Sequence, residues 1–317
     1  MNRKGINSLP SGNERQIVGL TLNWRDPERT VTCVASLLGE GIFHVLILDN
    51  SDDSGQSAVA LKQALGENPS VTILQSPANL GFAAGVNLGL TWIVEHCPCS
   101  WVVTINNDAK LLPGAVDAMR NALEVNPSSF LAYPNISHDG CVLGGLYYHR
   151  ISGLLRQSYF PGCFRYASGC CLLVATDRHP GSLFDEDFFM YGEDTELGWR
   201  LSKMPETMVH VPQNLVVHEG SASSGLGSPF YEARMVAAHL ILARKLTSNT
   251  IDYFLLLTCR VALLPLRATV RALRFWSLVP IKALWSGFQI ARGNDPVALK
   301  GNAYIDALLS RQSNSRL

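Results

Sequence analysis

The chain has 317 residues, enough for one large domain with an appendage or for two domains. Its formal net charge is zero, which gives no indication of a nucleic-acid-binding protein. The charges are unevenly placed, because residues 1–229 hold 14 Lys+Arg against 22 Asp+Glu whereas residues 230–317 hold 12 against 4. This distribution predicts an acidic body with a basic, apolar C-terminal region that contacts an anionic surface such as a membrane.

The first half of the chain alternates short apolar runs with helical patterns. Residues 1–15 are polar, lack the apolar core of a signal peptide and are expected to be disordered. The predicted strands cover 17–22, 43–48, 71–74 and 101–105, and the predicted helices cover 27–38, 56–65, 83–95 and 113–125. This alternation predicts a parallel, doubly wound α/β sheet with helices on both faces. Ligands of such sheets bind beyond the carboxyl ends of the strands.

The middle of the chain is less regular. We expect a buried strand at 168–174, a helix at 193–202, short strands at 207–211 and 215–217, and a mobile Gly- and Ser-rich segment at 218–223. The eight cysteines lie largely in apolar runs, and the pair Cys97-Pro-Cys99 has no second pair at zinc spacing. We therefore expect a reduced, cytoplasmic protein.

From residue 231 onward the pattern is helical, with arginines and tryptophans in an apolar background. Its uncharged stretches are shorter than the ~20 residues of a spanning helix, and Pro265 and Pro280 are expected to interrupt them. We expect helices that lie on a membrane with basic side chains toward the lipid head groups. The alternative is a helical cap packed on the domain or in a dimer.

The most informative segment is 184–200, where carboxylates alternate with large apolar residues. Its six carboxylates are Asp185, Glu186, Asp187, Glu193, Asp194 and Glu196. Such a mixture predicts carboxylates beside a partly buried pocket, where a drier environment raises the pKa and suits a general base. The alternative is an acidic surface loop anchored by core aromatics.

Two further motifs follow predicted strands. Asp108, the only carboxylate of Asn106-Asn107-Asp108, could hold a divalent cation that also binds phosphate, or the motif could be an Asx-turn. A neutral His218 could complete the metal shell, although alone it could equally be structural. In the segment 79–87, Gly81 and the following helix could let backbone N–H groups approach a phosphate or a sugar, or simply pack closely on the sheet.

Together these motifs resemble family 2 glycosyltransferases, and most closely the bacterial rhamnosyltransferase-like members, over about residues 16–225. They occur in this order: Asn23-Trp-Arg, Leu48-Asp-Asn-Ser-Asp-Asp-Ser-Gly55, Asn79-Leu-Gly-Phe-Ala-Ala-Gly-Val-Asn-Leu-Gly-Leu90, Asn106-Asn-Asp108, Ala167-Ser-Gly169, Phe184–Arg200 and His218-Glu-Gly-Ser221. The resemblance implies a GT-A fold with a mixed sheet over residues 16–228, followed by a helical, membrane-associating region over 229–317.

The resemblance also implies roles for individual residues. Asp194 matches the catalytic base, with Glu193 as its rival, and Asp108 and His218 match the ligands of Mg²⁺ or Mn²⁺. The donor would lie against Asn23, Asp49, Asn79, Gly81 and Asn107, with Asp49 contacting the nucleobase or ribose. Two departures stand out, since Asn106 and Asn107 replace acidic metal ligands and Arg25 replaces an asparagine.

The implied activity is inverting transfer of a sugar, rhamnose or similar, from a nucleotide-diphosphate sugar to a saccharide or polyprenyl-linked acceptor in cell-surface polysaccharide synthesis. The implied location is the inner face of the cell membrane, with self-association left open. One alternative is a sugar-nucleotide nucleotidyltransferase, which would normally carry glycines in the loop that here reads Leu22-Asn-Trp-Arg-Asp-Pro. Another is an inactive binding scaffold, against which the intact residues Asp108, Asp194 and His218 argue.

Overall fold

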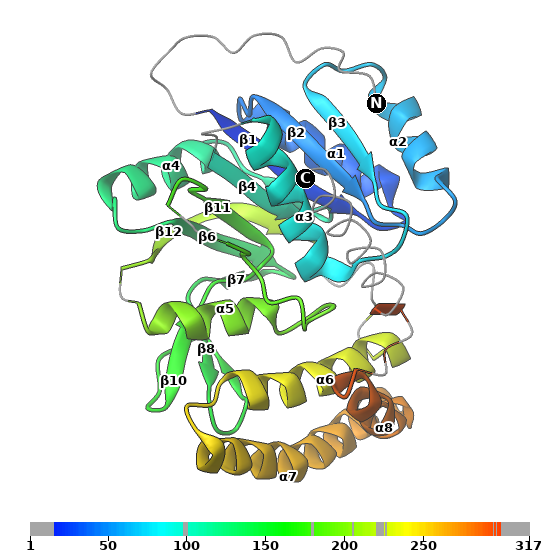
Figure 1. Ribbon diagram of the computed structural model, residues 1–317, viewed down its shortest axis with the longest axis vertical. Helices are drawn as coiled ribbons and strands as arrows, with labels where there is room; N and C mark the ends of the chain where they lie inside the picture. The colour runs from blue at the N-terminus through cyan, green and yellow to red at the C-terminus, as the bar shows by residue number, and fades with distance from the viewer. Residues whose placement is uncertain are drawn as a thin grey trace, which may run out of the picture.

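The computed structural model in Figure 1 places a large sheet with its helices above a small sheet and a group of C-terminal helices. It describes residues 16–97, 101–178, 181–204, 206–219, 225, 227–293, 295 and 297–298. The predicted disordered segment 1–15, Cys99 of the cysteine pair and most of the predicted mobile segment 218–223 lie outside the described residues.

The first half of the chain folds as the alternating pattern predicts. Four parallel strands take the order β3-β2-β1-β4. The strands are β1 (Ile17–Asn23), β2 (His44–Asp49), β3 (Val71–Gln75) and β4 (Trp101–Asn106), and the helices are α1 (Pro27–Gly39), α2 (Gln56–Leu65) and α3 (Gly81–His96). The helix α1 begins where predicted, since the Asp26 side chain accepts a hydrogen bond from the Arg29 amide and Pro27 occupies the first turn.

The second half extends the sheet with mixed strand directions, in the order β4-β11-β6-β12-β5. The elements are β5 (Ala109–Leu111), α4 (Ala115–Val125), β6 (Leu131–His138), β7 (Cys141–Leu143), β11 (Cys171–Val174), α5 (Glu193–Ser202) and β12 (Met208–His218). The strand β11 runs antiparallel to both β4 and β6. The parallel order predicted from alternation is confirmed from β3 to β4, and the mixed sheet implied by the family resemblance is confirmed from β11 onward, where no crossover helix separates β6 from β11.

Two local predictions differ from the structure. The two short strands predicted at 207–211 and 215–217 are one strand, β12, whose register with β6 shifts between Val211 and Val216. Pro212 lies in this stretch and has no N–H to donate to the ladder, which fits an irregularity there. The predicted strand 168–174 is shorter and begins at Cys171.

A small antiparallel sheet between β7 and β11 has no counterpart in the sequence prediction. It consists of β8 (Leu146–His149), β9 (Leu155–Arg156) and β10 (Cys163–Tyr166), in the order β10-β8-β9. It packs through Tyr148, Phe164 and Tyr166 into a second hydrophobic cluster that also takes in α6 and α7.

The C-terminal helices are α6 (Pro229–Lys245), α7 (Thr250–Phe275) and α8 (Val279–Ala291). The expectation that Pro265 interrupts the helix is wrong, because α7 runs unbroken through it. Pro265 lies on the exposed side, where its missing N–H removes a single bond of the helix. By length and composition alone, α7 could cross a membrane, and one face of it is buried against the protein through Leu256, Leu264 and Ala268.

The basic side chains of α7 are placed differently from the sequence expectation. Arg260 is only 1% exposed, and Arg267 and Arg271 pair with the buried carboxylate of Glu232 on α6. Three arginines expected to face lipid head groups thus anchor α7 to the protein, and among the α7 arginines only Arg274 is exposed.

Candidate active site

A cavity of about 190 Å³ lies beyond the carboxyl ends of β1, β2 and β4. The sequence-predicted residues on its wall are Asn79, Gly81, Asn107, Asp108 and His218. They come from three separate stretches of the chain, brought together because parallel strands end at one edge of the sheet. This position agrees with the prediction made from the strand ends.

The metal-binding candidates meet in one corner of this cavity. Asp108 follows β4 and His218 ends β12, and their Oδ1 and Nε2 atoms lie 3.0 Å apart. The Asn106 Oδ1 atom is buried without a hydrogen-bond partner in the described part of the chain, and Asn106 also lines the cavity. No group of three His, Cys, Asp or Glu able to hold a metal occurs among the described residues. The donor set therefore suits a cation that takes few protein ligands and completes its shell with phosphate and water oxygens.

The start of α3 forms another wall. Gly81 has φ +79°, and an added Cβ would lie 2.3 Å from the Phe189 carbonyl oxygen, so glycine is required there. The Asn79 side chain accepts from the Gly81 amide at 2.9 Å, and Asn50 donates to the Gly81 carbonyl at 2.9 Å. The Phe82 amide donates to the Phe189 carbonyl at 2.7 Å, which ties this loop to the acidic segment.

Asn23 and Asp49 lie behind the wall rather than on it. Asp49 is 1% exposed, and its Oδ1 accepts hydrogen bonds from Asn23 at 2.8 Å and from Ser51 at 2.5 Å. Arg25 donates to the Ser51 carbonyl at 3.0 Å and bonds the Asp52 carbonyl, so it braces the same turn. The structure thus favours a positioning role for Asp49 over the expected direct contact with the donor.

Asp194 lies in the first turn of α5 and is not among the residues that line this cavity, although Gly169, which lies next to Asp194, also lies next to Phe82 of the cavity wall. Its Oδ2 accepts from the Gly169 amide at 3.4 Å, and its Oδ1 accepts from the Thr195 amide at 2.6 Å. The carbonyl of Cys170, the residue after Gly169, accepts a hydrogen bond from the Asn106 backbone amide at 2.9 Å. The segment that binds Asp194 is therefore hydrogen-bonded to the strand end that precedes Asp108. Burial raises the pKa of Asp194, while the hydrogen bonds from Gly169 and Thr195 lower it.

Glu193 precedes Asp194 and is more deeply buried. It is 6% exposed, and its Oε2 atom has no hydrogen-bond partner in the described structure. Burial raises the pKa of Glu193 well above its ordinary value, and the charge of Asp194 raises it further. Of these two neighbours, Asp194 is the one whose ionised form is better stabilised, and Glu193 is the one whose protonated form is favoured.

The other four carboxylates of the acidic segment have donors of their own. Asp185 and Asp187 bind Lys245 at 2.6 Å each, and Glu196 binds Arg200 at 2.8 Å. Glu186 accepts a hydrogen bond from the side-chain Nδ2 atom of Asn87 at 2.8 Å. Within the described residues Glu186, Glu193 and Asp194 thus have no cationic partner, and of these three only Glu193 and Asp194 are withdrawn from solvent. Carboxylates of this segment do lie on the wall of a cavity, as predicted, but they are Glu186 and Asp187, on the second cavity described below.

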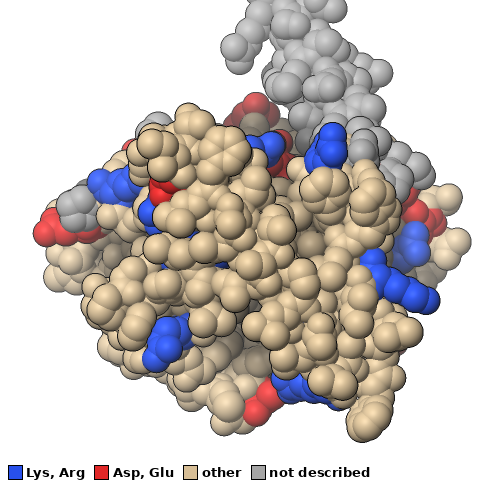
Figure 2. All heavy atoms as spheres, turned by 90° about the horizontal axis from the view of Figure 1, so that it is seen from below, with Lys and Arg blue, Asp and Glu red and all other residues tan. Residues whose placement is uncertain are grey.

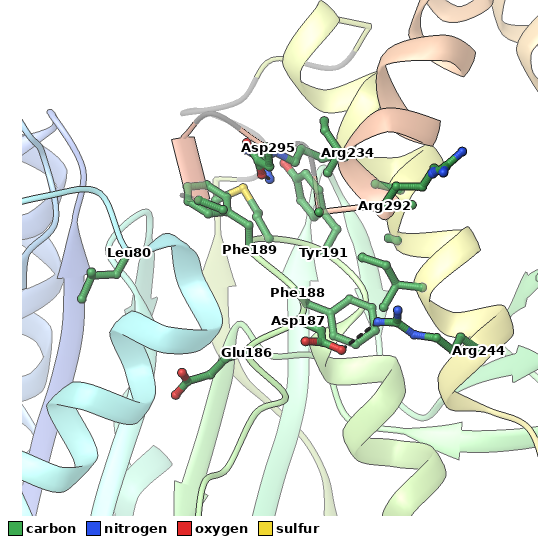
Figure 3. Close-up of a pocket in the computed structure, with 18 residues that line it drawn as sticks. Leu80, Glu186, Asp187, Phe188, Phe189, Tyr191, Arg234, Arg244, Arg292 and Asp295 are labelled. Carbon is green, nitrogen blue, oxygen red and sulfur yellow. Dashed lines mark hydrogen bonds and ion pairs between the residues drawn. The ribbon is translucent and has the colours of Figure 1, made fainter. Parts of the chain in front are cut away.

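A second cavity, of about 300 Å³, lies on the other side of the acidic segment, against α6 and the end of α8. Figure 3 shows Arg244 directed at Asp187 from α6, and Arg234 beside Asp295 at the far end. The Arg234 guanidinium lies 4.1 Å from the centre of the Phe189 ring. The two cavities share the wall Phe189–Tyr191.

Several wall residues of the first cavity were not singled out from the sequence. They are Trp24, Asn50, Tyr191 and Phe230. Asn50 lies inside the quoted motif after β2, so a closer inspection of that motif could have found it. Tyr191 has φ 69°, a left-handed conformation that is uncommon for a residue other than glycine. This conformation turns the chain at the wall that the two cavities share. Phe230 comes from α6, and nothing in its local sequence indicates that the helix returns to the cavity.

Comparison with known proteins supports the architecture and the motifs. The family model for glycosyl transferase family 2 matches residues 23–175. The N-acetylglucosaminyl-diphospho-decaprenol L-rhamnosyltransferases of two strains of Mycobacterium tuberculosis are 30% identical to this chain over 246 residues, which cover 67% of this chain and 75% of each relative.

A solved structure is similar over nearly the whole chain. The mannosyltransferase PcManGT from Pyrobaculum calidifontis, in complex with GDP-Man and Mn²⁺, superposes with a TM-score of 0.54 and 13% sequence identity, covering 92% of both chains. At this identity the likeness concerns the fold, which is the GT-A fold expected from the motifs.

Proposed function

The chain belongs to glycosyltransferase family 2, and from this premise we propose that it transfers rhamnose or a similar sugar from a nucleotide-diphosphate sugar to a lipid-linked saccharide. One observation carries the assignment of the chemistry. Of the six carboxylates in the acidic segment, only Glu193 and Asp194 are both withdrawn from solvent and without a cationic partner among the described residues, and they follow closely on Phe189–Tyr191, the wall that the two cavities share. Both the nucleotidyltransferase and the scaffold alternatives lack a comparable observation in their favour.

The donor is assigned to the cavity at the strand ends. The loop at Asn79–Gly81 and the side chain of Asn107 would contact it, and Trp24 and Phe230 offer aromatic faces at the rim. Asp108 and His218 would hold Mg²⁺ or Mn²⁺, and a divalent cation there would neutralise the charge of the diphosphate leaving group. Asn23 and Asp49 keep the wall in place from behind.

Asp194 is assigned as the general base. Its carboxylate accepts hydrogen bonds from backbone amides and so ionises before that of Glu193. It would remove the proton of the acceptor hydroxyl as that oxygen attacks the anomeric carbon and the nucleoside diphosphate leaves from the opposite face. A single displacement of this kind inverts the anomeric centre. Glu193 retains its proton and holds the start of α5 without adding a second charge.

The acceptor is assigned to the second cavity. It borders the acidic segment just before Asp194, and its other walls are α6 and the end of α8. Aromatic rings and fixed ion pairs, such as Phe189 with Arg234 and Asp295, suit the apolar faces and hydroxyls of a saccharide. Its volume of about 300 Å³ is typical of a small-molecule site.

A membrane-linked acceptor fits the C-terminal region. The outward face of α7 carries exposed apolar residues from Ile251 to Leu273, and Trp276 and Trp285 are 93% and 67% exposed. The name of the mycobacterial relatives includes N-acetylglucosaminyl-diphospho-decaprenol, a lipid-linked sugar. We assign α7 and α8 to the membrane surface, and we propose that this surface is the inner, cytoplasmic face of the cell membrane.

The base assignment is tested by Asp194→Asn, which keeps the shape but removes the proton acceptor. We expect transfer to fall by roughly 10²–10⁴-fold, while the donor affinity, measured by calorimetry, changes little. Product formation would be followed with a panel of nucleotide sugars and a short-chain, diphosphate-linked saccharide acceptor.

Asp185→Asn is the matched control, because Asp185 belongs to the same segment, forms an ion pair with Lys245 and is not among the residues that line either cavity. It should leave turnover close to that of the wild type. Wild-type turnover in Asp194→Asn, or loss of turnover in Glu193→Gln alone, would assign the base to another residue.

A further inference from the structure

Residues 150–162, which connect β8 to β10 and include the short strand β9, are unusually apolar and exposed. We call this segment the hairpin tip. Leu154, Leu155 and Tyr159 are 61%, 58% and 67% exposed, and Ile151 and Phe160 are also exposed. Tips of surface hairpins are ordinarily polar. Five large apolar side chains within ten residues therefore indicate a surface that meets another apolar phase.

The hairpin tip and the residues next to it in the sequence carry positive charges alone. Residues 140–176 contain no Asp or Glu but include Arg150, Arg156 and Arg165. Residues 253–294, which make up nearly all of α7 and α8, also contain no Asp or Glu but carry six Lys or Arg residues. Two segments distant in sequence thus share the same character, namely apolar and basic without carboxylates.

The fold brings these two segments into contact. Arg260 of α7 donates to the carbonyls of Arg150, at 2.7 Å, and of Ile151. The guanidinium of Arg150 in turn pairs with Asp252 in the first turn of α7. The base of the hairpin tip is therefore fixed to α7 by buried, charge-assisted hydrogen bonds, and Figure 1 shows the small sheet beside the start of this helix.

The face of the molecule formed by the C-terminal helices is largely uncharged. Figure 2 shows this face from below, with isolated Lys and Arg groups and few Asp or Glu groups across a broad area of uncharged residues. On α7, Ile251, Phe254 and Leu255 project outward close to where Asp252 meets the hairpin base.

We propose that the hairpin tip inserts into an anionic lipid bilayer together with the outward face of α7, so that the membrane contact is discontinuous in sequence. A bilayer suits this chemistry, because it accepts apolar and aromatic side chains at the interface and attracts cations to its head groups. A second copy of the chain fits less well, since two faces without carboxylates would bring unpaired cations together.

The second contact has a mechanical consequence, which rests on the proposed function. A membrane contact through α7 and α8 alone, at one end of the molecule, would leave the tilt of the domain less well fixed. The hairpin tip adds a contact outside these helices and fixes the tilt of the domain. The second cavity, between the acidic segment and α6, would then keep a constant height above the lipid surface.

The test uses the full chain with vesicles of phosphatidylethanolamine and phosphatidylglycerol. Hydrogen exchange of peptides covering 151–161 should slow when these vesicles are added, and much less with phosphatidylcholine alone. In a flotation assay, Leu154→Ser combined with Leu155→Ser should lower the vesicle partition coefficient by roughly tenfold for each leucine that is buried. Val59→Ser combined with Val125→Ser, at exposed positions of α2 and α4, is the matched control and should not change it.

Two results would overturn the proposal: unchanged exchange of 151–161 on anionic vesicles, or wild-type flotation of the leucine variant. A change in sedimentation from oligomer to monomer without a change in flotation would also overturn it and make the tip a self-association surface. Hydrolysis of the nucleotide sugar without acceptor reports on the proposed function separately, and the tip variant should retain it. Loss of vesicle binding with intact hydrolysis therefore concerns the tip alone.

Discussion

Glu193 and Asp194 are neighbours with the same functional group and different surroundings. Asp194 receives backbone hydrogen bonds from Gly169 and Thr195, whereas one oxygen of Glu193 lies buried without a partner. Hydrogen bonds stabilise an ionised carboxylate, and burial without them stabilises the neutral acid. Two adjacent carboxylates can thereby divide the tasks of accepting a proton and retaining one.

The raised pKa of Glu193 predicts a specific dependence of stability on pH. The folded protein binds this proton more tightly than the unfolded chain, so the stabilisation is complete below the ordinary pKa of 4.5 and is lost as pH rises through the raised pKa. Glu193→Gln cannot lose a proton. We expect its free energy of unfolding to exceed that of the wild type at alkaline pH, by about 1.4 kcal/mol for each unit of the pKa shift.

The measurement is the difference in free energy of unfolding between Glu193→Gln and the wild type, from pH 4 upward. This difference should grow with pH and be smallest in acid. Glu124→Gln, on the exposed face of α4, should show no such trend. A constant difference across the pH range would mean that Glu193 is ionised throughout.

At the scale of elements, α7 is attached to the protein through its arginines. Arg260 is nearly fully buried and donates to the Tyr148 hydroxyl at 3.2 Å and to two backbone carbonyls of the hairpin base. Burial and the nearby charges of Arg260 and Arg267 lower the pKa of His239 to about 3, so this histidine remains neutral beside them. The interface between α7 and the small sheet thus depends on one buried cation that binds backbone oxygens.

Arg260→Met is expected to be strongly destabilising. It leaves a hydroxyl and two carbonyls without their charged donor in a buried position, and we expect a loss of about 2–4 kcal/mol in the free energy of unfolding. Denaturant unfolding followed by circular dichroism measures this loss.

Arg274→Met is the control for the same substitution on the same helix, since Arg274 is exposed. Its effect should be within about 0.5 kcal/mol. Equal effects of the two substitutions would show that the buried contacts of Arg260 contribute nothing particular to the stability of the fold.

At the scale of the molecule, the donor cavity joins parts of the chain from Leu22 to Phe230. A ligand that bridges these parts binds only the folded state, so it should raise the melting temperature. At a hundredfold excess over Kd the stabilisation is about 2.7 kcal/mol. We expect the nucleotide sugar to raise the melting temperature by several degrees with Mn²⁺ and much less with EDTA.

His218→Ala should abolish the part of this shift that depends on Mn²⁺, because His218 supplies one of the two proposed ligands. His96→Ala is the control, since His96 lies exposed on α3 away from the cavity. A full shift in EDTA, or an unchanged Mn²⁺-dependent shift in His218→Ala, would remove the metal from the donor site.

The sequence predicted the elements of the first half to within about two residues, except for the short strand β5, which it missed. Periodicity and capping are local properties, and the strands and helices up to Val125 obey them. The motifs also identified Asp108 and His218, which the structure places 3.0 Å apart although 110 positions separate them. The prediction was weaker from residue 130 onward, where short strands follow one another and strand direction depends on contacts remote in sequence.

The orientation of charged side chains was not readable from the sequence. The arginines of α7 have the spacing of a basic membrane-facing helix, yet Arg260, Arg267 and Arg271 turn inward. The reason is that their partners, the carboxylate of Glu232 and the carbonyls of the hairpin base, lie on other elements. A helical pattern specifies which residues share a face, but not what that face meets.

The sequence alone determined the fold class, the edge of the sheet at which the candidate site lies, and the chemistry of its side chains. The reason is that strand periodicity and short polar motifs are properties of residues close together in the sequence. Only the tertiary structure decided which two of the six carboxylates are withdrawn from solvent without a cation among the described residues, and that the hairpin tip and α7 form one surface. Both depend on the long-range arrangement of α6 and α7 around the sheet domain. Burial and charge pairing are properties of that arrangement, and no local pattern encodes them.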